Sequence, residues 1–150
     1  MDPKIEESKR LLKIADHMIY VTYPVIKESK ILIKILDEIG TAISNIIDSI
    51  LQNECRKKMI RISSDPKANF ESFIKISKDY GIPSQMIGEI DSILSLVERH
   101  KKSPMEFSRK DKVIIMQETL RTESVNVNDL KRYMGTAKEL LRIVDSAPKN

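Results

Sequence analysis

The stretch from Val25 to Ile62 constrains the fold more than any other part of the chain. Apolar residues recur in it at helical spacing and cover a broad arc, while charged and amide side chains hold the opposite side. The apolar positions are Leu32, Ile35, Leu36, Ile39, Ala42, Ile43, Ile46, Ile47 and Ile50. Because so wide an arc needs at least two neighbours, the segment is predicted to be the long central helix of a bundle. Gly40 is tolerated inside it at about 1 kcal/mol relative to alanine.

Four further helices are predicted around this central one. Asp2-Pro3 is a favourable helix start, and Pro24 is expected to end the first helix because proline disrupts a helix interior. The third and fourth helices form a hairpin across the turn residues that follow Gly81. The expected ranges are about Pro3 to Thr22, Pro66 to Gly81, Ser84 to His100, and Asn128 to a point before Pro148.

The helical pattern fails between Lys101 and Asn126. Val113 to Met116 is a β-favouring apolar run, and Ser124 to Val127 alternates polar and apolar residues. A β-hairpin or extended arm is therefore expected over Val113 to Asn126, just before the last helix. The prediction as a whole is an all-α antiparallel bundle of about five helices, with residues 1–150 forming one domain.

Composition excludes several classes of protein. Tryptophan is absent and aromatic residues make up 5%, so the core is expected to be aliphatic. The apolar region from Ile31 to Leu51 is interrupted by charged residues, which argues against a membrane span. The single cysteine, Cys55, cannot form an intrachain disulfide, and MDPKIEESKR contains no apolar signal core. These features predict a cytoplasmic protein.

Arg10 and His17 are the candidate catalytic pair. Seven positions separate them, so they project from the same side of the first helix, nearly two turns apart. A cation that stabilises a phosphorane and a histidine that moves a proton would suit metal-free RNA cleavage. Both residues lie almost opposite the apolar stripe and are flanked by Glu6, Lys9 and Lys13. That pattern is typical of a solvated helix face, on which only a second subunit would complete a site.

Two basic clusters are candidate contacts for nucleic acid. The net charge of the chain is +4, which mildly favours an anionic partner. If the helices alternate up and down, the second and fourth run the same way and both clusters meet at one end of the bundle, where they could hold phosphates. Cations at helix C-termini are also favoured by the helix dipole alone. The candidates are Arg56, Lys57, Lys58 and Arg61 in one cluster, and Arg99, Lys101 and Lys102 in the other.

The run DHMIYVTYP, from Asp16 to Pro24, together with the apolar helix after it, resembles a group of small, uncharacterised archaeal proteins. The five-helix plan is similar to that of the HEPN superfamily, whose members are helical, often dimeric, and include RNases. The HEPN ribonuclease motif has an arginine, four to six residues and a histidine on a late helix. Arg10 and His17 match its spacing on the first helix, with Leu11 after the arginine. The resemblance implies the fold and dimerisation.

The function favoured by these observations is a HEPN-like interaction module without catalysis of its own. It is expected to form a homodimer, and its further partner would be a nucleic acid or a second protein. The alternatives are a metal-free RNase that uses Arg10 and His17 at a dimer interface, and a weak nucleic-acid-binding protein. Two scattered histidines are too few for a metal site, so no metal and no cofactor is expected.

Overall fold

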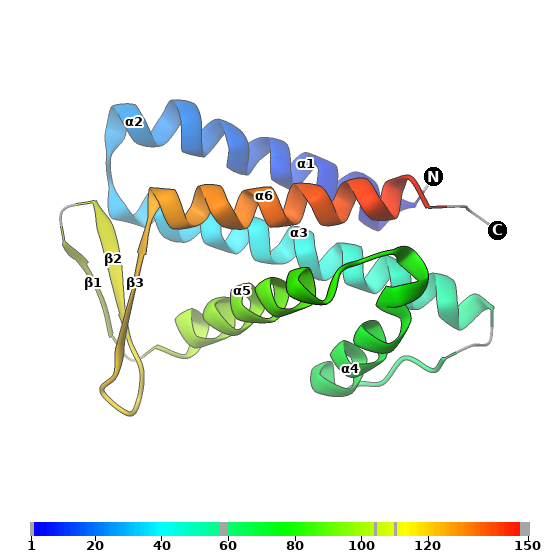
Figure 1. Ribbon diagram of the computed structural model, residues 1–150. Helices are drawn as coiled ribbons and strands as arrows, with labels where there is room; N and C mark the ends of the chain where they lie inside the picture. Colours follow the sequence, from blue (N-terminus) through cyan, green and yellow to red (C-terminus); the bar gives the residue numbers. More distant parts are fainter. Residues whose placement is uncertain (1, 58–59, 104, 110, 148–150) are drawn as a thin grey trace.

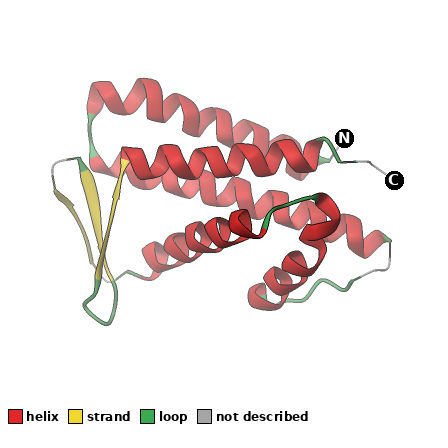
Figure 2. Cartoon of the chain, in the orientation of Figure 1, coloured by secondary structure: helices red, strands yellow, loops and turns green. Residues whose placement is uncertain are grey.

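The structure is a computed structural model that describes residues 2–57, 60–103, 105–109 and 111–147. These residues form five long helices and a three-stranded antiparallel sheet, which lies at one end of the bundle (Figures 1 and 2). The long helices are α1 (Pro3–His17), α3 (Ser29–Arg56), α4 (Pro66–Ser77), α5 (Ser84–Lys102) and α6 (Val127–Asp145). The strands are β1 (Met105–Arg109), β2 (Lys112–Met116) and β3 (Thr122–Asn126). The predicted helical bundle, with a β segment before its last helix, is confirmed.

Helix α3 is the centre of the bundle, as its wide apolar arc predicts. All nine apolar positions of that arc are buried, and Lys34 and Thr41 on the opposite side are exposed. The buried residues of α3 belong to one core cluster with those of α1, α5, α6 and the sheet. Within the described residues, no helix has a stretch apolar enough to cross a membrane.

The first helix does not end at Pro24, contrary to the sequence prediction. α1 passes into a π-helical turn, Met18–Thr22, and then into α2 (Tyr23–Ile26), which contains the proline. The N–H of Tyr23 bonds the carbonyl of Met18, five residues back, so the helix widens just before the proline. A proline ring normally clashes with the preceding turn, and the wider turn accommodates it. The helix ends instead at Lys27, which adopts a left-handed conformation with φ 55°.

Helix α5 runs back along α3 in the opposite direction. Near its start, the Tyr80 hydroxyl accepts a hydrogen bond from Asn53 in the last turns of α3. Near its end, His100 lies 3.4 Å from Asp37, in the first half of α3. Helix α4 is only 12 residues long and forms the outer arm of a hairpin with α5 (Figure 1). The predicted hairpin is therefore present, but the predicted parallel direction of the second and fourth helices is wrong.

The sheet is a meander in the order β1–β2–β3. Its inner face places Val113, Ile115 and Val125 in the core. The predicted apolar run and the alternating segment are β2 and β3, whereas the sequence analysis did not predict β1. Asn126 then caps α6, and a reciprocal pair of hydrogen bonds with Asp129 forms a capping box.

Gly40 marks a close approach between α3 and α5. A Cβ atom added at this glycine would lie 2.8 Å from Cγ2 of Val97. Val97 is buried and its β-branched side chain has little freedom to turn away. The glycine therefore has a packing role that the helical pattern alone does not reveal.

We predict that Gly40→Ala destabilises the protein. Overpacking a core costs about 1–3 kcal/mol, which exceeds the gain of about 1 kcal/mol from alanine's helix propensity. Gly135→Ala in α6 is the matched control, because a Cβ there meets nothing within 4 Å. Thermal and urea unfolding should show Gly40→Ala less stable and Gly135→Ala more stable than wild type. Adding Val97→Ala to Gly40→Ala should relieve the clash, and independent effects of the two changes would contradict this account.

Candidate functional site

An open groove of about 790 Å³ runs along the seam between α1 and α6. The two helices lie side by side and antiparallel (Figure 1). Four of the lining residues are apolar, namely Leu12, Tyr20, Val21 and Leu141. The charged and titratable lining residues are Glu6, Lys9, Arg10, Lys13, Asp16, His17, Lys138, Arg142 and Asp145. All nine of these side chains come from two helices that are far apart in sequence.

Ion pairs fasten the two helices across this groove. Lys9 lies 3.1 Å from Asp145 at one end, and Lys138 lies 2.7 Å from Asp16 farther along. Hydrogen bonding to Asp145, and then to Glu6, raises the pKa of Lys9. These side chains are about 36% to 52% exposed, so water screens both pairs and each adds little to the stability of the fold. The pairs set the position of α6 along α1 more than they stabilise the fold.

Arg10 and His17 both line the groove and both are exposed, as the sequence analysis expected for this helix face. The guanidinium of Arg10 makes a bidentate pair with Glu7, with Nε 2.9 Å from Oε2 and Nη2 2.5 Å from Oε1. Among the described residues, no side chain hydrogen-bonds the imidazole of His17. Arg10 therefore already has a carboxylate partner, whereas none of the described side chains orients the ring of His17.

The groove opens at one end onto exposed apolar residues. Tyr20 is 56% exposed and Val21 51%, and beyond them Val25 is 81% and Ile26 51% exposed. Nζ of Lys131 lies 5.2 Å from the centre of the Tyr20 ring, in a cation–π contact. Tyr20, Val21, Val25 and Ile26 are named here the apolar corner. The sequence signal for it was present, because Tyr20 and Val21 fall outside the buried stripe of the first helix.

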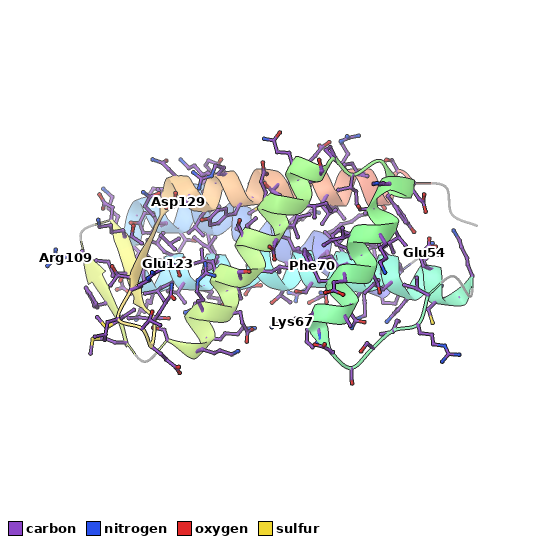
Figure 3. The ribbon with its side chains drawn as sticks, turned by 60° about the horizontal axis from the view of Figure 1, so that its bottom comes forward. Glu54, Lys67, Phe70, Arg109, Glu123 and Asp129 are labelled. Carbon is purple, nitrogen blue, oxygen red and sulfur yellow. The ribbon has the colours of Figure 1, made fainter. Side chains whose placement is uncertain are left out.

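The two predicted basic clusters do not meet. Because α5 is antiparallel to α3, Arg56 and Lys57 lie at one end of the bundle and Arg99, Lys101 and Lys102 at the other. Glu54 pairs with Lys57, and Glu123 pairs with Arg99. In Figure 3 these two glutamates lie toward opposite ends of α3. His100, beside Arg99 in the second cluster, lies next to Asp37 of α3. From Asp37 to Arg56, α3 rises roughly 28 Å at about 1.5 Å per residue. The expected convergence of both clusters at one end is therefore wrong.

Several of the predicted phosphate contacts already have carboxylate partners. Arg99 makes a bidentate pair with Glu123, with Nε 2.5 Å from Oε2 and Nη2 2.7 Å from Oε1. Lys57 lies 3.7 Å from Glu54, and Lys102 lies 3.0 Å from Glu98. Arg56, Arg61 and Lys101 are exposed, and Lys58 lies outside the described residues.

A polar cluster that the sequence analysis missed joins α3, α5 and β1. Nε2 of His100 lies 3.4 Å from Asp37, and Nδ1 contacts the Glu106 carboxylate. The His100 side chain is only 14% exposed. Sequence spacing could not reveal this cluster, because its three residues come from three separate elements.

The part of the chain that the structure describes contains no group of three or more metal-ligating side chains with suitable geometry. Comparison of the chain with family models, curated proteins and solved structures finds no match. The α1–α6 groove with its apolar corner, hereafter the groove surface, is therefore the candidate site on geometric grounds alone.

The Arg10–Glu7 pair leads to a pH prediction. Hydrogen bonds from Arg10 lower the pKa of the Glu7 carboxyl below its ordinary value. The stabilising contribution of the Arg10–Glu7 pair is therefore present above the ordinary carboxyl pKa. It is lost as the pH falls through the lower pKa that Glu7 has in the folded state. We expect Arg10→Ala to raise the pKa of Glu7 toward the ordinary value of a glutamate carboxyl, as measured by NMR titration.

Glu139 provides the internal control for this titration. Its pKa is lowered by Arg142 in the same way, and Arg10→Ala should leave it unchanged. Because Arg10 is exposed, the substitution should leave the free energy of unfolding nearly unchanged. A Glu7 pKa that does not change in Arg10→Ala would mean that the pair does not form in solution.

Proposed function

We propose that this chain is a HEPN-like interaction module that acts as a homodimer and has no catalysis of its own. Its groove surface binds an amphipathic helix of a partner protein, one with an apolar stripe flanked by acidic residues. The observation that carries the proposal is a groove that displays cations on both walls and continues into the apolar corner.

The shape of the groove supports a helix as the ligand. Its two walls are antiparallel helices, and a third helix laid along their seam would extend the bundle by the packing that already joins its members. Tyr20, Val21 and Leu141 line the groove and provide apolar contacts for such a helix. Exposed apolar residues that form a contiguous surface with a charged rim are typical of protein interaction sites.

The charges of the groove support acidic flanks on that ligand. Five lysines and arginines line it, against three carboxylates. The carboxylates that pair with Arg10 and Arg142, Glu7 and Glu139, are not among the lining residues. Lys13 is exposed and forms no ion pair with any described residue. Opposite charges at such a rim contribute mainly to specificity and to the rate of association.

The surroundings of Arg10 and His17 argue against catalysis. A general base in a nucleolytic site is usually oriented by a further side chain and partly closed off from water. His17 is exposed, and no such orienting contact exists among the described residues. The RNase alternative therefore requires a second subunit to close the groove and to reorganise the Arg10–Glu7 pair.

Binding can be tested with a synthetic helical peptide of about 20 residues, long enough to span about 30 Å. The peptide carries leucines at i, i+3, i+4 and i+7, and glutamates on both flanks. We expect fluorescence anisotropy to show binding that Lys13→Glu weakens at least about tenfold, equivalent to about 1.4 kcal/mol. Val21→Ser should also weaken it through lost apolar contact.

Two controls make this test specific. Lys67→Glu changes an exposed lysine on α4, outside the groove, and should leave the affinity unchanged. A peptide with lysines in place of the glutamates should bind more weakly than the acidic peptide. Equal binding of both peptides, or the same affinity in Lys13→Glu, would rule out the groove surface as an acidic-helix site.

The absence of catalysis is a separate prediction. Without metal ions, the wild-type protein should cleave no single-stranded RNA from about pH 5 to pH 8, the range in which imidazole titrates. His17→Ala serves to identify any contaminating nuclease, whose activity would persist in the variant. A wild-type activity that disappears in both His17→Ala and Arg10→Ala would establish the RNase alternative.

A further inference from the structure

Strand β1 is an open edge at the outer end of the molecule. It pairs with β2 on one side, and in Figure 1 its other side faces away from the helices. All five of its residues are exposed. Apart from Met105, whose backbone contacts the Ser103 hydroxyl, β1 makes no backbone hydrogen bonds with described residues other than those of the sheet. An edge of this kind is a template for another strand.

The outer face of the sheet beside this edge carries four apolar side chains, with Arg109 and Lys112 at one end. Met105 lies opposite Met116, and Phe107 lies opposite Ile114. Met105 and Phe107 are large apolar side chains, yet Met105 is 55% exposed and Phe107 is 37% exposed. No described element covers this face, while the inner face of the sheet is packed on the bundle.

The inner side chains of β1 hold the strand in position. Glu106 contacts Nδ1 of His100, and the Ser108 hydroxyl contacts that of Ser29 at the start of α3. Both contacts point toward the bundle, so Met105, Phe107 and Arg109 are directed outward by the alternation of a strand. A strand already held in its extended form loses little conformational entropy when another strand pairs with it.

We propose that two copies of this chain pair antiparallel through their β1 edges, joining two three-stranded sheets into one of six strands. The pairing is isologous, with Phe107 of each copy on the twofold axis. The proposal rests on the homodimer of the proposed function and specifies its surface. The residues that line the groove take no part in the pairing, so each copy keeps its groove surface.

Charge and aromatic contact together favour one register of this pairing. A twofold axis that relates two antiparallel edge strands is perpendicular to the sheet, so a residue must lie opposite its own copy. Centring on Glu106 would place two carboxylates face to face, which is unfavourable. Centring on Phe107 places the two aromatic rings together, Glu106 opposite Ser108, and Met105 opposite Arg109. No like charges oppose one another in that register.

A charge-swap experiment tests both the surface and the register. Analytical ultracentrifugation should find the wild-type chain as a dimer at high micromolar concentration. Phe107→Lys and Phe107→Glu should each sediment as monomers, because like charges would lie about 5 Å apart on the axis. An equimolar mixture of the two variants should return to the mass of two chains, since opposite charges then meet.

Three controls separate this outcome from others. Circular dichroism should show both variants folded, as expected for an outward side chain, and recovery in the mixture would itself demonstrate intact folds. Leu120→Lys, an exposed leucine between β2 and β3, should remain dimeric. Phe107→Lys should still bind the acidic peptide, so failure of the groove proposal and failure of the edge pairing are distinguishable.

Three results would each overturn the proposed pairing. They are a monomeric wild-type chain, Phe107 variants that remain dimeric, and a mixture of the two variants that stays monomeric.

Discussion

The rest of the structure depends on the burial of the wide apolar face of α3. Thirteen of its 28 residues are buried, and α1, α4, α5, α6 and β2 all pack against it. At Gly40 the absence of a side chain lets Val97 of α5 approach closely. This contact places α5 directly against α3 and runs it back toward the sheet. The last turns of α5, with Arg99 and His100, therefore lie beside the sheet.

The cationic end of α5 consequently has a structural role. Arg99 binds Glu123 of β3 through two hydrogen bonds, and His100 lies between Asp37 of α3 and Glu106 of β1. Bidentate pairs of this kind are stronger than single-contact surface pairs. Charges that resemble a phosphate-binding cluster in the sequence thus attach the two outer strands to the bundle.

In the proposed arrangement, binding and dimerisation use different elements. The groove surface belongs to the helix pair α1–α6 and its continuation through α2, whereas the open edge belongs to β1. A dimer built on the edges carries two groove surfaces, and a partner with two acidic helices would gain affinity from engaging both. Arg10 and His17 of the two copies are not brought together by such a dimer, which agrees with a module that does not catalyse.

The sequence by itself determined the helices whose apolar period is strong, the β-favouring run of β2 and the exposed face that carries Arg10 and His17. These features are set by local spacing, which a single segment contains. Only the tertiary structure decided the continuation of the first helix through Pro24, the direction of α5, the pairing of β1 and the second wall of the groove. The direction of α5 and the second wall of the groove depend on contacts between residues far apart in the chain, whereas the passage through Pro24 and the pairing of β1 with β2 depend on local backbone hydrogen bonds that apolar spacing does not reveal. Lys138 meets Asp16, and His100 meets Asp37 and Glu106, only because the packing around α3 brings them together.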